Sequence, residues 1–330
     1  MNQTLNGIRR ILITILVAMG VGALFIVAIG ENPIDAYAAL FRGAFDGELR
    51  LGTTLAGFTP LLLTSIAFAV AAKAGAFNVG VEGEVFLGGI TAAYIGINWT
   101  FLPKPALYVA CFVGAMVVAA AWALIPAVLR AYYNVNEVCT TILMNTVALY
   151  ITSYLVSGPM SAGTANAQSL PVTVRLYQFM KPSSVNVGIF IAAITVIVII
   201  FMLQKSSWGY KIRTVGLNPT HADYVGIDSK KVFVGAMMLS GMLGGMAGCI
   251  EVLGVHGYFL NNFATGLGSN GMLAALIVKN NMVSTPFMAF FLAVLKSGAM
   301  GMQQSTGVPK SLVDTITAVF IIIATMETAF

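Results

Sequence analysis

The chain has 330 residues, of which 58% are hydrophobic and 9% are charged, and its formal net charge is +5. A mean hydropathy of +0.89 and several apolar runs of roughly twenty residues exclude two soluble domains and indicate a polytopic, all-helical membrane protein. The runs lack the period-two alternation of outer-membrane barrels. The basic residues gather at the ends of the runs, which favours a role in membrane topology over nucleic-acid binding.

About ten transmembrane helices are predicted within a single domain that covers residues 1–330. In chain order they lie at about 11–29, 51–72, 83–98, 106–129, 137–157, 185–203, 232–253, 272–278, 282–300 and 311–328. A cleaved signal peptide is the alternative for the first run, although that run is longer than a usual signal core. Residues 31–50 are amphipathic and are expected along the outer interface, and residues 158–184 form the largest predicted outer loop.

The distribution of basic residues predicts the orientation in the membrane. Ten spans put both termini in the cytoplasm, with ten of the seventeen Lys and Arg residues inside, six outside, and Lys296 within span nine. Because cytoplasmic loops carry an excess of Lys and Arg, this asymmetry supports the assignment. The predicted localisation is therefore the cytoplasmic membrane.

The longest hydrophilic interval, residues 205–231, is expected to be cytoplasmic and to contain one short helix. Asn218 is a suitable N-cap, Pro219 suits the first helical position, and Gly226 can end the helix in a left-handed conformation. Two helical turns held in a loop form a rigid projection. A plain connector or a lipid-facing amphipathic turn is the alternative reading of this local pattern.

Three stretches of the chain carry a resemblance to a known family. VGLNPTHADYVGI in the hydrophilic loop, AGAFNVGVEGEVFLGG at 74–89 and YNVNEVCTTILMNTVALY at 133–150 resemble ABC importer permeases of the branched-chain amino acid, ribose and nucleoside group. Together they look most like the larger permease subunit of nucleoside (BmpA-linked) importers, and the resemblance runs from about residue 30 to the C-terminus. It implies nucleoside import, with sugars, riboflavin-like compounds and lipids as alternative solutes.

The resemblance also implies partners and a coupling element. The expected partners are the lipid bilayer, a second homologous permease subunit, a cytoplasmic ABC ATPase and an extracytoplasmic substrate-binding lipoprotein, with no nucleic acid. The ATPase would dock on residues 216–227, which we call the coupling segment. The residues expected to couple the ATPase are Gly216, Asn218, Pro219, Ala222, Tyr224 and Gly226.

Two intervals, 74–84 and 262–271, interrupt the apolar pattern at comparable places after spans two and seven. In transporters with inverted repeats, such interruptions mark the translocation site. We therefore expect spans 2–5 and 7–10 to form two inverted repeats, a reading that the resemblance also supports. Ordinary glycine-rich turns are the alternative.

Polar residues within or beside apolar runs are the candidate lining of a solute pathway, since ionisable groups in a bilayer usually face a cavity or a partner. The candidates are Phe77, Asn78, Glu82, Asn136, Glu137, Asn145, Ser269 and Asn270. Asn78 and Glu82 are the favoured pair. Glu82 and Glu84 are two residues apart and therefore lie on different faces of a helix, so at most one is expected to face the pathway and the other to bond to a backbone N–H or a cytosolic cation. Phe77 has packing as its alternative, and Asn136 and Glu137 have capping of span five.

No catalytic constellation is visible, so the chain is not expected to be an enzyme. It contains no Gly-Lys dipeptide and therefore no Walker A motif, and any ATP must be bound by a partner subunit. The histidines His221 and His256 have no carboxylate at ligand spacing, and the three cysteines have no metal spacing. No metal or cofactor is therefore expected. An ion-coupled secondary transporter with Glu82 or Glu137 as proton site, or a membrane scaffold, are the rival functions.

Overall fold

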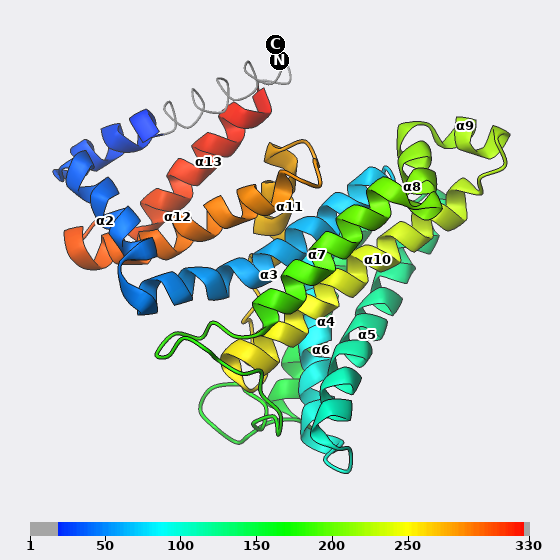
Figure 1. The fold of residues 1–330 in the computed structure, drawn as a ribbon, viewed down its shortest axis with the longest axis horizontal. Helices are drawn as coiled ribbons and strands as arrows, with labels where there is room; N and C mark the ends of the chain where they lie inside the picture. Colours follow the sequence, from blue (N-terminus) through cyan, green and yellow to red (C-terminus); the bar gives the residue numbers. More distant parts are fainter. Residues whose placement is uncertain (1–18, 327–330) are drawn as a thin grey trace.

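The computed structural model describes residues 19–326, which fold almost entirely into helices (Figure 1). The helices are Met19–Ile29, α2 (Pro33–Phe45), α3 (Gly47–Lys73), α4 (Val81–Asn98), α5 (Lys104–Tyr133), α6 (Glu137–Ser157), α7 (Gly188–Lys205), α8 (Ser207–Leu217), α9 (Pro219–Tyr224), α10 (Ser229–Ile250), the π-helix η1 (Glu251–His256), α11 (Leu267–Ile277), α12 (Thr285–Thr306) and α13 (Lys310–Met326). Within the described range, β-structure is limited to isolated bridges that involve the loop of residues 158–187.

Six of the described helices are long and apolar enough to cross a membrane, which confirms an all-helical polytopic membrane protein. They are α3, α5, α6, α7, α10 with η1, and α12, and they match predicted spans two, four, five, six, seven and nine. A seventh is added if Met19–Ile29 and α2, which meet at 113°, form one broken span. Residues 11–18 of predicted span one lie outside the described residues.

The other predicted spans match helices that differ from simple crossings. The short eighth run is part of α11, whose 11 residues cannot cross a hydrocarbon core of about 30 Å alone. Predicted spans three and ten correspond to α4 and to the described part of α13. The interval 31–50 forms α2 and the start of α3, and α2 packs its buried Ala36, Leu40 and Ala44 against α12.

The long helix α3 lies between two groups of helices (Figure 1). On one side α2, α12 and α13 gather, with α12 packed against both α2 and α3. On the other side α10 packs against α3, α4 and α5, and α4 packs against α6. The pair α8 and α9 projects beyond the helices at one end, and the loop of residues 158–187 covers the opposite end.

Small residues in the stretch SGMLGGMAG allow α10 to approach its neighbours closely. A Cβ atom on Gly248 would overlap the carbonyl oxygen of Val85 in α4, and one on Gly245 would overlap the carbonyl oxygen of Ala115 in α5. Glycine at these positions brings the backbones into contact, which is how helices pack in a membrane where the hydrophobic effect does not drive association. The core of this group of helices is therefore built around α10.

The end of α10 widens into the π-helix η1, which stops at Gly257 with φ +78°. The loop of residues 158–187 lies along this end of the chain, because the backbone N–H groups of Leu176 and Val172 donate to the carbonyls of Leu253 and Gly257, each at 2.9 Å. Single π-turns are frequent at functional sites. Here the π-helix forms part of the wall of a cavity.

Candidate functional site

The coupling segment has the local structure that its sequence predicted. The side chain of Asn218 caps α9 by accepting from the backbone N–H of His221 at 3.0 Å, and Pro219 is the first helical residue. The helix ends at Tyr224, and Gly226 follows in the left-handed conformation with φ +81°. These three features fix where α9 begins and ends and how the backbone turns on either side of it.

The projecting surface of the coupling segment exposes three large apolar side chains beside its polar residues. Leu217 is 88% exposed, Tyr224 is 86% exposed, and Val225 is also exposed, whereas Ala222 is completely buried. Clustered large apolar side chains in solvent are typical of a protein–protein contact. Leu217 and Val225 were not among the predicted coupling residues, because their exposure depends on how α8 and α9 are anchored.

Backbone contacts anchor the coupling segment to the helix bundle. A side chain on Gly216 would overlap the carbonyl oxygen of Lys73 at the end of α3, and its Cβ would lie 3.2 Å from the backbone nitrogen of Gly75. At the other end, both carboxylate oxygens of Asp223 accept from the backbone N–H and hydroxyl of Ser229, each at 2.9 Å. The segment is therefore held against α3 and α10, while Leu217 and Tyr224 remain exposed.

Beside this end of α10, Asp228 caps the helix. Its carboxylate accepts from the backbone N–H of Lys231 at 3.0 Å and forms an ion pair with the Lys231 ammonium, also at 3.0 Å. The backbone hydrogen bond is the main cause that lowers the pKa of the exposed Asp228 carboxyl below its ordinary value. This capping fixes where the loop ends and α10 begins.

Asn78, one of the two favoured pathway residues, bonds in the structure to Glu84. The buried Asn78 amide donates to Glu84 Oε1 at 2.8 Å and to Ser240 Oγ at 2.9 Å, and its carbonyl oxygen accepts from Gly80 N at 2.9 Å. Glu84 thus bonds to a side-chain amide, whereas the glutamate facing away from the pathway was expected to bond to a backbone N–H or a cytosolic cation. These contacts join the 74–80 loop, α4 and α10.

The two interrupted intervals meet in the structure. Glu82 at the start of α4 accepts a hydrogen bond from Ser269 in α11 at 3.4 Å, and a Cβ atom on Gly268 would overlap the backbone of Glu82. Asn270 donates its side-chain amide to the carbonyl of Gly266 in the preceding turn. Residues 187 positions apart in the chain are therefore in contact at this point.

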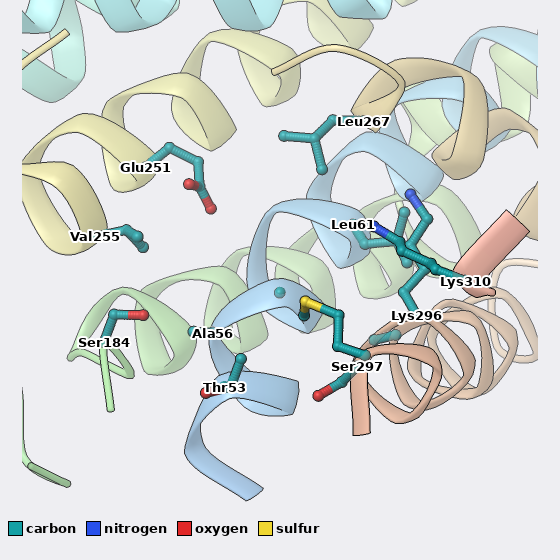
Figure 2. A pocket seen from close by; sticks show the side chains of 13 residues that line it. Thr53, Ala56, Leu61, Ser184, Glu251, Val255, Leu267, Lys296, Ser297 and Lys310 are labelled. Carbon is teal, nitrogen blue, oxygen red and sulfur yellow. The ribbon is translucent and has the colours of Figure 1, made fainter. Parts of the chain in front are cut away.

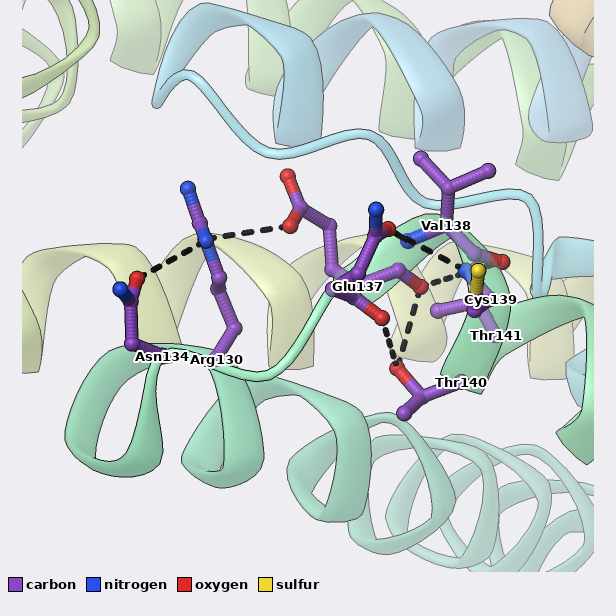
Figure 3. Close-up of polar contacts among 8 residues, drawn as sticks. Arg130, Asn134, Glu137, Val138, Cys139, Thr140 and Thr141 are labelled. Atoms are coloured by element: carbon purple, nitrogen blue, oxygen red, sulfur yellow. Dashed lines mark hydrogen bonds and ion pairs between the residues drawn. The ribbon is translucent and has the colours of Figure 1, made fainter.

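Two of the remaining predicted pathway residues, Asn136 and Glu137, lie where α5 ends and α6 begins. Asn136 caps α6 by accepting from the N–H groups of Val138 and Cys139, and Glu137 pairs with Arg130 of α5 at 3.1 Å (Figure 3). This arrangement favours the capping alternative for Asn136.

Asn145 and Phe77 contact the same region from two other elements. The Asn145 side chain accepts from Gly83 N at 2.7 Å and donates to Val79 O at 2.8 Å, which ties α6 to the start of α4. Phe77 packs edge-on against Phe68 with ring centroids 5.0 Å apart. These contacts use both polar groups of the Asn145 amide, and they favour the packing alternative for Phe77.

We expect Asn78→Ala to lower the thermal stability of the purified protein, because it leaves Ser240 and Glu84 buried without their shared donor. Unsatisfied buried polar groups cost roughly 1–3 kcal/mol each. The unfolding temperature in detergent measures the effect, and it is read from the loss of monodisperse protein as the sample is heated. Asn98→Ala, which removes an exposed bond to Tyr94 O, is the matched control. Equal unfolding temperatures for the two variants would contradict this role of Asn78.

A cavity of about 300 Å³ lies between α3, η1 and α12 (Figure 2), and we call it the α3–α12 cavity. Its polar lining comprises Thr53, Ser184, Glu251, Lys296, Ser297 and Lys310. A second cavity of about 260 Å³ lies between α11, α12 and α13, with Asn270, Asp314 and Thr317 in its walls. Lys296 lines both cavities.

Of the polar residues that line these cavities, sequence reasoning had placed only Asn270 in the candidate pathway. The signal was present, because Glu251 and Lys296 are charged residues inside apolar runs. His256 does have a carboxylate neighbour in the structure, since its Nε2 lies 3.5 Å from Glu251 Oε2 across one turn of the π-helix. Within residues 19–326 no cluster of three or more His, Cys, Asp or Glu side chains could hold a metal ion.

The amino-acid sequence is similar to those of several named ABC transporter permease proteins. The chain is 32% identical over 321 residues to the guanosine ABC transporter permease protein NupP of Bacillus subtilis, covering 94% of this chain and 91% of NupP. It is 32% identical over 323 residues to the glucose ABC transporter permease protein TsgB13 of Haloferax volcanii, covering 94% and 85%. It is 30% identical over 335 residues to the nucleoside ABC transporter permease protein NupB of Lactococcus lactis, covering 97% and 91%.

The family model described as the branched-chain amino acid transport system permease component matches residues 50–325. This range begins within α3, near the end of the bundle that the loop of residues 158–187 covers, and includes the coupling segment, both interrupted intervals and the two cavities. The chain therefore belongs to the branched-chain amino acid transport system permease family.

Proposed function

We propose that this chain is the membrane-spanning subunit of an ATP-binding cassette importer that carries nucleosides across the cytoplasmic membrane. Two of the relatives described above, NupP and NupB, are named as guanosine and nucleoside permeases. The observation that carries the proposal is the coupling segment, a capped short helix with exposed Leu217 and Tyr224 at the end of the bundle (Figure 1). A separate ATPase subunit docks on this tip, and the chain itself hydrolyses nothing.

The proposed orientation puts the coupling segment in the cytoplasm and the loop of residues 158–187 outside. An extracytoplasmic binding lipoprotein delivers solute to that outer face, and a second, homologous permease subunit completes the transporter. Both termini lie in the cytoplasm. The basic residues of the loop 205–231 support this orientation by the positive-inside rule.

We also propose ten spans with two inverted repeats, α3–α6 and α10–α13. In support, the interrupted intervals at the starts of α4 and α11 lie against each other through Glu82 and Ser269. In transporters with inverted repeats, such interrupted segments meet near the translocation site. When ATP binding draws the ATPase subunits together, motion of α9 reaches the bundle through the contact of Gly216 with the end of α3.

A sugar permease is the second candidate, because TsgB13 is named as a glucose permease at the same identity as NupP. A third possibility, an ion-coupled transporter, needs no ATPase. These alternatives predict different solutes and different energy sources, so one assay separates them.

Uptake into liposomes that contain the assembled complex tests the proposal. We expect radiolabelled guanosine to accumulate only with ATP and the binding protein present, and glucose not to accumulate. A complex whose ATPase subunit cannot hydrolyse ATP is the control. Glucose accumulation in place of guanosine would favour the sugar permease, and accumulation driven by a proton gradient without ATP would overturn the importer assignment.

A further inference from the structure

The α3–α12 cavity has charges of opposite sign on opposite walls. Figure 2 shows Glu251 on η1 at one side, with Lys296 and Lys310 extending from α12 and the start of α13 at the other. The hydroxyl groups of Ser297 and Thr53 lie in the same lining. The cavity therefore presents an acceptor wall and a donor wall across an otherwise apolar space.

Lys296 forms no ion pair with a carboxylate among the described residues, although Asp314, which lines the second cavity with it, and Glu82 attract its charge from a longer distance. It lies in the middle of α12 with its side chain partly buried, and across residues 19–326 no carboxylate comes within 4.0 Å of its ammonium group. A charged group in a membrane helix is costly and usually faces a cavity or a partner. An oxygen-bearing ligand in the cavity would supply that partner.

Glu251 is held in place but keeps acceptor capacity. Its carboxylate is largely buried, and Oε2 lies 3.5 Å from His256 Nε2. The His256 carbonyl in turn accepts from Arg175 Nη2 at 2.8 Å, which fixes this turn against the outer loop. A carboxylate has about four acceptor positions, so Glu251 can still accept from two adjacent N–H groups of a ligand.

We propose that the α3–α12 cavity binds a nucleoside, with the ribose hydroxyls toward Lys296 and Ser297 and the N–H groups of the base toward Glu251. The inference rests on the proposed function and assigns its solute site. A cavity of about 300 Å³ is at the lower end of the range for small-molecule sites, and this size suits one nucleoside. Guanine fits the acceptor wall because it presents an imino and an amino N–H side by side.

The role of Glu251 leads to a specificity prediction. Inosine lacks the amino group of guanosine, so a carboxylate that accepts from both N–H groups favours guanosine. Glu251→Gln replaces one acceptor with a donor and should raise the KM for guanosine about tenfold or more while changing that for inosine less. Lys296→Met should reduce uptake of both nucleosides about tenfold or more, and Lys296→Arg should retain most of it.

A thiol-labelling experiment tests whether guanosine occupies the α3–α12 cavity of the assembled transporter, with Glu251 and Lys296 left unchanged. Met300 lines the cavity and is exposed, so Met300→Cys is made in a Cys139→Ser background, where the remaining Cys111 and Cys249 are buried. Tyr177→Cys in the outer loop is the control cysteine, and Lys104→Met, at the exposed start of α5, is the control for loss of a positive charge.

We expect guanosine to slow thiol labelling at position 300 and not at position 177, glucose to have no effect, and Lys104→Met to transport normally. If guanosine is transported but does not protect position 300, and Glu251→Gln keeps the selectivity for guanosine over inosine, the site lies elsewhere and the proposed function stands. If the unaltered complex transports no nucleoside, the proposed function fails and this assignment falls with it.

Discussion

Gly248→Val should abolish accumulation of folded protein in the membrane. A Cβ atom at this position would overlap the carbonyl oxygen of Val85 and lie 2.7 Å from the backbone nitrogen of Gly89, both in α4. Adding carbon to a packed core already costs roughly 1–3 kcal/mol when flexible side chains can move aside. Here the obstacle is backbone on the facing helix, so α10 and α4 must separate and the cost is larger.

The comparison variant for this prediction is Gly20→Val, since a Cβ at Gly20 has no heavy atom within 4 Å among the described residues. The measurement is the amount of monodisperse protein extracted from membranes, relative to the unaltered chain. Gly20→Val should reach the normal level and Gly248→Val a small fraction of it. Normal yield of Gly248→Val would mean that α10 and α4 are not in backbone contact.

The coupling segment was predictable in detail because its determinants are local. Asn218, Pro219 and Gly226 act within a few residues of themselves, through a cap, a fixed φ angle and a left-handed turn. No distant element is needed to read them. The exposure of Leu217 could not be predicted from the sequence, because it depends on the packing of Gly216 against the end of α3.

The candidate site was only partly predictable because its partners are remote in sequence. Spacing correctly put Glu82 and Glu84 on different faces of one helix, but it could not show that Glu82 meets Ser269 while the Asn78–Glu84 pair extends to Ser240. Those contacts depend on how α10 and α11 pack against α4.

The lining of the α3–α12 cavity could also be predicted from the sequence only in part. Glu251 and Lys296 are recognisable from sequence as charges in apolar runs, but their common cavity exists only through the packing of α3, η1 and α12. Hydropathy likewise identified the six long apolar helices as spans, whereas α11 has too few residues for its hydropathy alone to identify it as a span.

Asn218→Ala combined with Gly226→Val should uncouple ATP hydrolysis from transport. Loss of the cap costs about 1 kcal/mol, and a β-branched residue at φ +81° costs roughly 1–2 kcal/mol more, so α9 should no longer hold its position. A Cβ at Gly226 meets no heavy atom within 4 Å among the described residues, so the effect comes from backbone strain and not from overlap with the bundle. The helices that hold the α3–α12 cavity should be unaffected.

Two single-residue controls separate coupling from general damage. Asn218→Ser keeps a capping side chain, and Gly226→Asn places a residue that tolerates the left-handed conformation. Both should transport at close to the normal rate. The double variant should reach the membrane in normal amount and still show protection of the Met300→Cys position by guanosine.

The decisive measurement is the ATPase rate of the reconstituted complex with and without the guanosine-loaded binding protein. We predict that the double variant keeps the basal rate, loses most of the stimulation by loaded binding protein, and loses guanosine uptake in the same proportion. A double variant that is stimulated and transports at the normal rate would contradict the central claim that the coupling segment transmits the work of the ATPase to this chain.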